Sequence, residues 1–323
     1  MANSMMIGNN SPSPSESSPS QEIVIKTIGL SKHYGDVRAV DGLDLCIRQG
    51  EIYGFLGRNG AGKTTTIRLL LGLIRPTAGQ VMMLGSRIEP GRQAVFARVG
   101  YLVETATAYP NLTVHENLDI QRQLTGAPRR AIAEAIELLR LGEYADRRAG
   151  RLSLGNKQRL ALARVLLHHP NVLLLDEPAN GLDPAGIVEV RGLLRRLADE
   201  RGVTVFLSSH ILAEVAQLAD RIGIMHAGRL VEELGQDKLR AQARAHLEVL
   251  VSNADRAAAL LAERLGIMRV ERTTEGGLRI FDGLDRTAAI ARVLACDGLD
   301  LTRLCLVEED LEAHFLRLTG GGM

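Results

Sequence analysis

Residues 57–65 carry the clearest chemical pattern in the chain and read Gly-Arg-Asn-Gly-Ala-Gly-Lys-Thr-Thr. They match the phosphate-binding template G-x-x-x-x-G-K-[ST] at every fixed position. Glycines there let backbone N–H groups turn toward phosphates without a Cβ in the way. We expect Lys63 to reach the terminal phosphates of a nucleoside triphosphate, and the Thr64 hydroxyl to ligate the Mg2+ that accompanies it. The candidate nucleotide-binding residues of this stretch are Gly57, Asn59, Gly60, Ala61, Gly62, Lys63, Thr64 and Thr65.

Such a loop needs a strand before it and a helix after it, and the flanking sequence has both patterns. Residues 51–56 read as a short buried strand, and residues 64–71 have the apolar spacing of a helix. The positive end of that helix would face the phosphates. The alternative is a glycine-rich turn with an incidental Lys-Thr pair, which the two flanking elements disfavour.

Two adjacent carboxylates, Asp176 and Glu177, follow the continuous apolar run 171–175. Such a run is typical of a central parallel strand, and ligands bind at the carboxyl ends of strands in open α/β sheets. With a phosphate loop upstream, the pair predicts a Mg2+ partner in Asp176 and a water-activating base in Glu177. An isolated pair of this kind would usually be a solvated strand end.

His210 follows a further expected strand at residues 203–207. A lone histidine is commonly a surface or hydrogen-bonded residue. At the carboxyl end of a sheet strand, however, an imidazole would come within reach of the terminal phosphate. Glu177 and His210 are therefore the candidate catalytic residues.

Composition describes an ordinary globular protein of 323 residues, 46% hydrophobic and 24% charged. A net charge of +1 indicates no general attraction to nucleic acid or acidic membranes. Three scattered cysteines favour reduced thiols. The sequence contains neither a signal-peptide pattern nor the run of roughly 18 apolar residues that a membrane span needs. We therefore expect a cytosolic protein whose membrane role, if it has one, depends on a partner.

Periodicity and composition divide the chain into a tail and two domains. Residues 1–21 are rich in Ser and Pro, have little to bury, and are predicted to be disordered. Residues 22–240 form the first domain, in which the strands 23–30 and 39–47 flank a loop containing Tyr34. A helical subdomain is expected at about 105–168, where Thr113 and Glu116 have the spacing of a capping box.

Residues 243–319 are expected to form the second domain. Strands are predicted at 246–251, 268–272, 278–281 and 301–307, and helices at 256–265, 287–294 and 309–318. The resulting β-α-β-β-α-β order predicts a small ferredoxin-like α+β domain. We expect a dimer-supporting or regulatory role for it rather than that of a ligand sensor.

Over residues 23–240 the set of motifs resembles the nucleotide-binding domain of ATP-binding-cassette (ABC) ATPases. The resemblance identifies residues 57–65 as the Walker A loop, 152–158 as the signature motif, 172–177 as the Walker B strand, 180–183 as the D-loop with Asp183, and His210 as the switch histidine. It implies that Tyr34 stacks on adenine. It also implies a head-to-tail dimer, in which Ser153, Gly155 and Gln158 of one protomer complete the ATP site of the other.

Two departures from the usual family pattern are visible. The signature reads Leu-Ser-Leu-Gly-Asn-Lys-Gln instead of Leu-Ser-Gly-Gly-Gln, with Ser153 and Gly155 retained. Glu104 stands where most of the family has a glutamine, and its carboxylate can still ligate Mg2+. With a glutamate at this position, the chain resembles the subgroup that drives antibiotic and bacteriocin self-protection exporters. Residues 109–118 and the C-terminal residues 310–320 resemble the same subgroup.

The expected fold is an α/β P-loop NTPase of the ABC type, with a RecA-like core, an antiparallel β subdomain and a helical subdomain, plus the small C-terminal α+β domain. The resemblance implies an ATP-hydrolysing subunit, dependent on ATP and Mg2+, that powers export of a drug, antibiotic or similar compound. Its partners would be a separate membrane permease and a second ATPase subunit at the cytoplasmic face of the cell membrane, with no nucleic acid.

Two other functions are weighed against this one. A soluble ABC ATPase acting on nucleic acid or ribosomes usually carries two cassettes or a long coiled-coil arm, and this chain has one cassette and no heptad run between its motifs. A phosphotransferase built on the same loop would not explain residues 152–158.

Overall fold

The structure is a computed structural model that describes residues 22–89, 91, 94–103, 108–235, 245–273, 276–308 and 315. Several expectations fall outside these residues: the tail at 1–21, the Mg2+ ligand Glu104, the boundary between the two expected domains at 240–243, and all of the expected helix 309–318 except Phe315. In the part of the chain that is described, no helix has the length and apolar character needed to cross a membrane.

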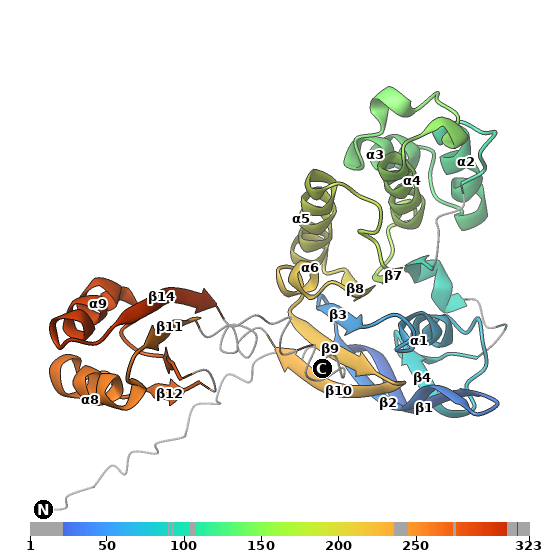
Figure 1. The fold of residues 1–323 in the computed structure, drawn as a ribbon. Helices are drawn as coiled ribbons and strands as arrows, with labels where there is room; N and C mark the ends of the chain where they lie inside the picture. Colours follow the sequence, from blue (N-terminus) through green and yellow to red (C-terminus); the bar gives the residue numbers. More distant parts are fainter. Residues whose placement is uncertain are drawn as a thin grey trace, which may run out of the picture.

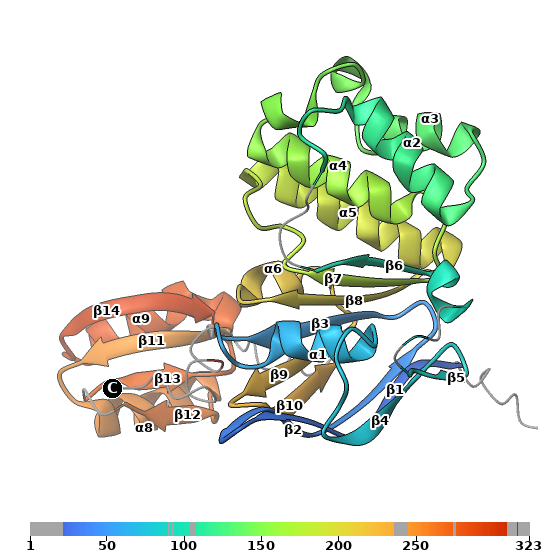
Figure 2. The ribbon, with the colours of Figure 1, turned by 90° about the vertical axis from the view of Figure 1, so that its right-hand side faces the viewer.

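A six-stranded sheet occupies the centre of the nucleotide-binding part (Figures 1 and 2). Its strands are β3 (Ile52–Gly57), β6 (Val99–Leu102), β7 (Val172–Asp176), β8 (Thr204–Ser209), β9 (Arg221–His226) and β10 (Arg229–Gly235). They lie in the order β10-β9-β3-β8-β7-β6, and only the β9–β10 pair is antiparallel. The carboxyl ends of β3, β8 and β7 are therefore neighbours at one edge, where ligands bind in such sheets.

Side chains alternate between the two faces of this sheet, and each face has its own core. In β7, Leu173 and Leu175 join one hydrophobic cluster, whereas Val172 and Leu174 join the other. This is the period of two that a strand imposes, and burial on both faces explains why the run is continuously apolar. The expectation that this run is a central strand is confirmed.

Helices cover both faces of the central sheet. They are α1 (Lys63–Leu70), α2 (Val114–Thr125), α3 (Arg130–Leu138), α4 (Leu154–Leu166), α5 (Pro184–Arg201) and α6 (Leu212–Ala216). Figure 2 shows α4 and α5 on one side of the sheet and α1 on the other, with α2 and α3 stacked beyond α4. The expected capping box at the start of α2 is confirmed, because Thr113 Oγ1 accepts from the Glu116 N–H and Glu116 Oε2 accepts from the Thr113 N–H.

An antiparallel four-stranded sheet packs on the α1 side, with the order β2-β1-β4-β5. Its strands are β1 (Ile23–Tyr34), β2 (Val37–Arg48), β4 (Ala78–Met83) and β5 (Ser86–Arg87). The prediction of a loop between the first two strands at residues 32–35 is wrong. Strand β1 continues through Lys32 and His33 to Tyr34, which pairs with Val37 across a tight turn at Gly35 and Asp36. The polar side chains hid the strand from the hydrophobic pattern, while the ladder with β2 stabilises it.

The C-terminal elements form a third sheet with its own hydrophobic core. They are β11 (Ala245–Val251), α8 (Ala254–Leu265), β12 (Val270–Arg272), β13 (Leu278–Ile280), α9 (Thr287–Cys296) and β14 (Leu301–Glu308). The sheet has the order β12-β13-β11-β14 with every pair antiparallel. This confirms the β-α-β-β-α-β order predicted from the sequence, with α8 and α9 packed against each other beside the sheet.

Candidate active site

The phosphate loop connects the buried strand β3 to the first turn of α1. Gly62 caps this helix with a φ of 111°, and a Cβ at this position would lie 2.2 Å from the backbone oxygen of Ala39. Both the dihedral angle and the close approach require glycine there. The loop therefore presents backbone N–H groups of the α1 N-terminus toward the edge where the central strands end.

Lys63 lies beneath this loop and is only 6% exposed. Its Nζ donates hydrogen bonds to the backbone oxygens of Gly57, at 2.7 Å, and Arg58, at 3.4 Å. The same Nζ lies 3.5 Å from Oε1 of Glu177. The backbone carbonyls thus hold the ammonium group within the loop. An entering anion would replace these carbonyls as the acceptor of its hydrogen bonds.

Asp176 and Thr64 meet at the opposite side of the loop. Thr64 Oγ1 donates to Asp176 Oδ2 at 2.7 Å, joining α1 to the end of β7. The other carboxylate oxygen, Oδ1, accepts a 2.5 Å hydrogen bond from Ser208 Oγ. Hydroxyl and carboxylate oxygens are the donors that Mg2+ prefers, so the pair fits the metal that the sequence predicted. Ser208 was not singled out from the sequence, although its position at the end of β8 is a signal that could have found it.

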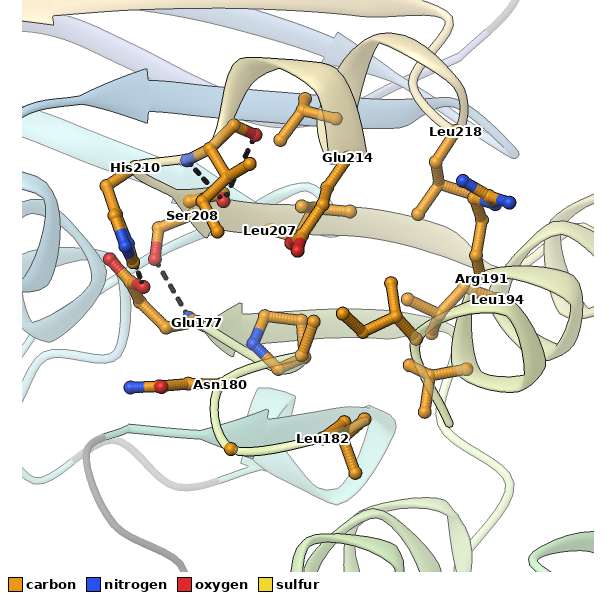
Figure 3. A pocket seen from close by; sticks show the side chains of 18 residues that line it. Glu177, Asn180, Leu182, Arg191, Leu194, Leu207, Ser208, His210, Glu214 and Leu218 are labelled. Atoms are coloured by element: carbon orange, nitrogen blue, oxygen red, sulfur yellow. Dashed lines mark hydrogen bonds and ion pairs between the residues drawn. The ribbon is translucent and has the colours of Figure 1, made fainter. Parts of the chain in front are cut away.

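Glu177 is aimed at His210 across the ends of two neighbouring strands (Figure 3). His210 Nδ1 lies 2.5 Å from Glu177 Oε2. The Glu177 backbone has a φ of 51°, a conformation that non-glycine residues rarely adopt, and its N–H donates to the Ser208 backbone oxygen and to Ser208 Oγ. Strained backbone of this kind is often found at functional sites, where neighbouring contacts hold it.

The expected signature residues lie at the start of α4. Ser153 is the N-cap of that helix, and its Oγ accepts from the Asn156 N–H at 3.3 Å. Ser153 is exposed, so its hydroxyl is also available to a group outside the chain. Gln158 is oriented differently, because its Nε2 donates to the Pro178 backbone oxygen of the same chain at 2.7 Å.

Comparison with known proteins agrees with this geometry. The family model described as "ABC transporter" matches residues 40–180. The bacitracin transport ATP-binding protein BcrA of Bacillus licheniformis is 44% identical over 300 residues, which cover 93% of this chain and 98% of that protein. The chain belongs to the ABC transporter family. The family hydrolyses ATP, and this member is therefore an ATP hydrolase with a nucleotide-binding site.

Other ABC proteins are similar over most of their length. The daunorubicin resistance ATP-binding protein DrrA3 of Streptomyces coeruleorubidus is 37% identical, covering 93% of this chain and 96% of that protein. A solved ATP-binding subunit of an ABC transporter superposes with a TM-score of 0.62 at 28% identity, covering 68% of this chain and 92% of that chain. The dimeric cassette MJ0796 bound to ADP and Pi superposes with a TM-score of 0.61 at 25% identity, covering 66% of this chain and 98% of that chain.

Two further residues expected in the site of this ABC protein, Tyr34 and Asp183, lie at the end of a strand and at the start of a helix. Tyr34 ends β1 with its ring 49% exposed and the Lys32 ammonium 4.9 Å from the ring centroid. An exposed aromatic face of this kind can stack on a base. Asp183 is the N-cap of α5, and its Oδ1 accepts from the Gly186 N–H at 2.9 Å. Asp183 therefore fixes the end of the D-loop, a role that the motif alone does not indicate.

A third carboxylate lies close to the Glu177–His210 pair. Glu214 on α6 lines the same cavity as both residues (Figure 3). Burial raises the pKa of Glu214, positive charge on His210 opposes the shift, and the negative charge of Glu177 adds to it. No pattern in the sequence singles out this residue.

Phe315 is, after Ser208 and Glu214, a third residue near the site that the sequence did not single out. It is buried in the hydrophobic cluster that includes α4, α5 and α6, although it lies at least 99 positions further along the chain than any residue of these helices. With His210, His226 and Ala227, it also borders a hollow beside the phosphate loop at residues 58–61. Only the tertiary structure brings this C-terminal residue to the nucleotide site.

Proposed function

We propose that this ABC protein is the ATP-hydrolysing subunit that powers export of a drug, an antibiotic or a similar small compound through a separate membrane permease. The observation that carries the proposal is the meeting of Lys63, Asp176, Glu177 and His210 at the carboxyl ends of three adjacent strands. The similarity to bacitracin transport and daunorubicin resistance ATP-binding proteins over more than 90% of the chain supports the exporter assignment.

In this mechanism each side chain has a separate task. Lys63 and the N–H groups of the phosphate loop bind the β- and γ-phosphates, and Tyr34 stacks on the adenine. Thr64, Asp176 and Glu104 would hold Mg2+, which neutralises charge on the phosphates when bound. Glu177 accepts a proton from the attacking water, and His210 contacts the terminal phosphate while holding the Glu177 carboxylate in place.

The proposed active form is a head-to-tail dimer. Ser153 and Gly155 at the exposed start of α4 would complete the phosphate site on the partner's Walker A loop. The structural similarity to a dimeric cassette with bound ADP and Pi supports this assembly. The subunit would work at the cytoplasmic face of the cell membrane, bound to its permease, with the C-terminal α+β domain (about residues 243–319) as a dimer-supporting or regulatory unit.

Copurification tests this function against a soluble ABC ATPase that acts on nucleic acid or ribosomes. The tagged chain, expressed in its source cells, should be recovered from detergent-solubilised membranes together with an integral membrane protein. Recovery with ribosomes or RNA, and with no membrane protein, would support the alternative instead.

The loop that leads into α2 has a geometry suited to contact with such a permease. Asn117 is buried and holds this loop from α2: its Oδ1 accepts from the Tyr109 N–H, and its Nδ2 donates to the Tyr109 and Thr113 backbone oxygens. The Tyr109 ring is nevertheless 51% exposed. A rigid backbone that presents an exposed aromatic ring is a typical contact site for a partner protein.

We predict that Tyr109→Ala will uncouple the subunit from its permease. Basal ATPase of the isolated subunit should stay within about twofold of wild type, because the ring is exposed and its loop is held through backbone atoms. Permease-stimulated ATPase and transport should fall by about 10-fold, the effect of losing an aromatic anchor worth over 1 kcal/mol. Both rates are measured with the purified subunit and with the reconstituted complex.

Tyr109→Phe is the matched control, because it keeps the ring and should keep most of the stimulation. If the permease stimulates Tyr109→Ala as strongly as wild type, this loop is not the coupling surface. An equal loss of basal and stimulated activity would indicate a folding defect, which a lowered Tm would reveal.

A further inference from the structure

The loop of residues 178–183, which includes the D-loop at 180–183, is attached to the signature helix of the same chain. The amide of Gln158 donates to the Pro178 backbone oxygen at 2.7 Å. Four residues earlier on the same helix, Leu154 packs against Gly181: a Cβ at Gly181 would lie 2.5 Å from Leu154 Cδ2. The first turns of α4 therefore contact this loop at Pro178, just before the D-loop, and at Gly181 within it.

On its other side this loop borders a cavity, and its Leu182 packs against the hydrophobic cluster that includes α4, α5 and α6. Residues 178–182 border a cavity of about 190 Å3, whose far walls are α5, the end of β8 and α6. Figure 3 shows Asn180 and Leu182 on the loop that follows Glu177, along one side of this cavity. The hydrogen bond from Gln158 and the packing of Leu154 therefore help to position this loop at one wall of the cavity.

The position of the loop bears directly on Glu177. Pro178 follows Glu177 immediately, and Glu177 itself has the unusual φ of 51°. Strained backbone persists only where surrounding contacts hold it. A shift of Pro178 would therefore change the direction of the Glu177 side chain and its approach to His210 and Lys63.

We infer that Gln158 is a positioning residue for hydrolysis in its own protomer, holding the D-loop and through it Glu177, rather than a contact to nucleotide bound by the partner. This inference rests on the proposed dimeric mechanism. Ser153 is the N-cap of the same helix, and in the proposed dimer it contacts the nucleotide bound by the partner. A displacement of α4 on engagement of Ser153 would be transmitted through Gln158 and Leu154 to Glu177 in the other site of the dimer.

Gln158→Met tests the assignment, because methionine keeps the length of the side chain but cannot donate to Pro178. The homodimer should lose about 3- to 10-fold in kcat, the factor for one neutral hydrogen bond, with KM for ATP unchanged. Gln123→Met is the matched control, because it removes the same kind of side-chain amide from an exposed position on α2, where Gln123 Nε2 donates to Asp119 Oδ2 at 2.7 Å. It should keep the wild-type kcat. A raised KM with unchanged kcat would overturn the inference.

Mixed dimers with two different tags separate an action within one protomer from an action across the interface. All are compared with a pair of wild-type and Ser153→Arg chains, which retains one composite site. In a pair of Gln158→Met and Ser153→Arg chains, the remaining site takes its Walker A loop and Glu177 from the Ser153→Arg chain, whose Gln158 is unaltered. Its turnover should equal that of the reference pair. When both substitutions are on one chain and its partner is wild type, the remaining site should show the 3- to 10-fold loss. The reverse pattern would overturn the inference.

Hydrogen exchange in the monomer distinguishes failure of this inference from failure of the dimeric mechanism. Amides of residues 179–182 should exchange faster in Gln158→Met than in wild type and in Gln123→Met. Equal exchange in all three proteins would overturn the inference even if the mixed dimers are active. An inactive reference pair would count against the proposed dimer, while faster exchange would still support the contact between Gln158 and the D-loop.

Discussion

Glu177→Gln should bind ATP with nearly wild-type affinity and lose about 10²- to 10⁴-fold in ATP turnover, the usual contribution of a general base. The amide keeps the shape of the carboxylate and its place beside His210 and Lys63, at 2.5 and 3.5 Å in the native structure. It cannot accept a proton from the attacking water. Steady-state phosphate release and equilibrium binding of a fluorescent ATP analogue measure the two effects separately.

Two controls make this prediction specific. Glu214→Gln removes the neighbouring carboxylate, and we expect turnover to change by less than about threefold because that group is partly solvated. Lys63→Ala should instead weaken ATP binding, since it removes a charge that the ground-state triphosphate already contacts. Turnover close to wild type in Glu177→Gln would exclude Glu177 as the base, and an unchanged ATP affinity in Lys63→Ala would contradict the assignment of the phosphate loop.

Ser153→Arg should abolish turnover, by at least about 100-fold, while each monomer still binds ATP at its own phosphate loop. Ser153 is at the exposed N-cap of α4, so a long cationic side chain would extend from the surface that has to face the partner's nucleotide. The sandwich dimer would then fail to close. Size-exclusion chromatography with ATP in the Glu177→Gln background measures dimer formation directly.

Loss of the helix cap is a separate effect that needs its own control. Ser153→Asp keeps an oxygen that can cap α4, at a cost near zero, but places a negative charge against the partner's phosphates. It should melt like wild type and still lose turnover. Mixing Ser153→Arg with Lys63→Ala chains leaves one composite site with both motifs intact, and turnover should partly recover. If Ser153→Arg alone is fully active, the sites do not form across a dimer.

The sequence by itself determined the elements whose signals are local. The phosphate loop with its strand and helix, the apolar run ending at Asp176, the Thr113–Glu116 capping box and the β-α-β-β-α-β order of the C-terminal elements were all predicted within a few residues. In each case neighbouring residues carry the information: glycine dihedral angles, a period of hydrophobicity, or a side chain that caps its own helix. The family resemblance rests on the same local motifs.

Only the tertiary structure decided how these pieces meet. The strand order β3-β8-β7 places Ser208 against Asp176, and strand pairing extends β1 to Tyr34 in spite of its polar end. The same holds for the contact of Gln158 with Pro178 and for Phe315 beside the phosphate loop. Apart from the β1–β2 pairing, these contacts join residues 20 or more positions apart. A side chain carries no sequence pattern that identifies so distant a partner, because packing of the whole chain selects it.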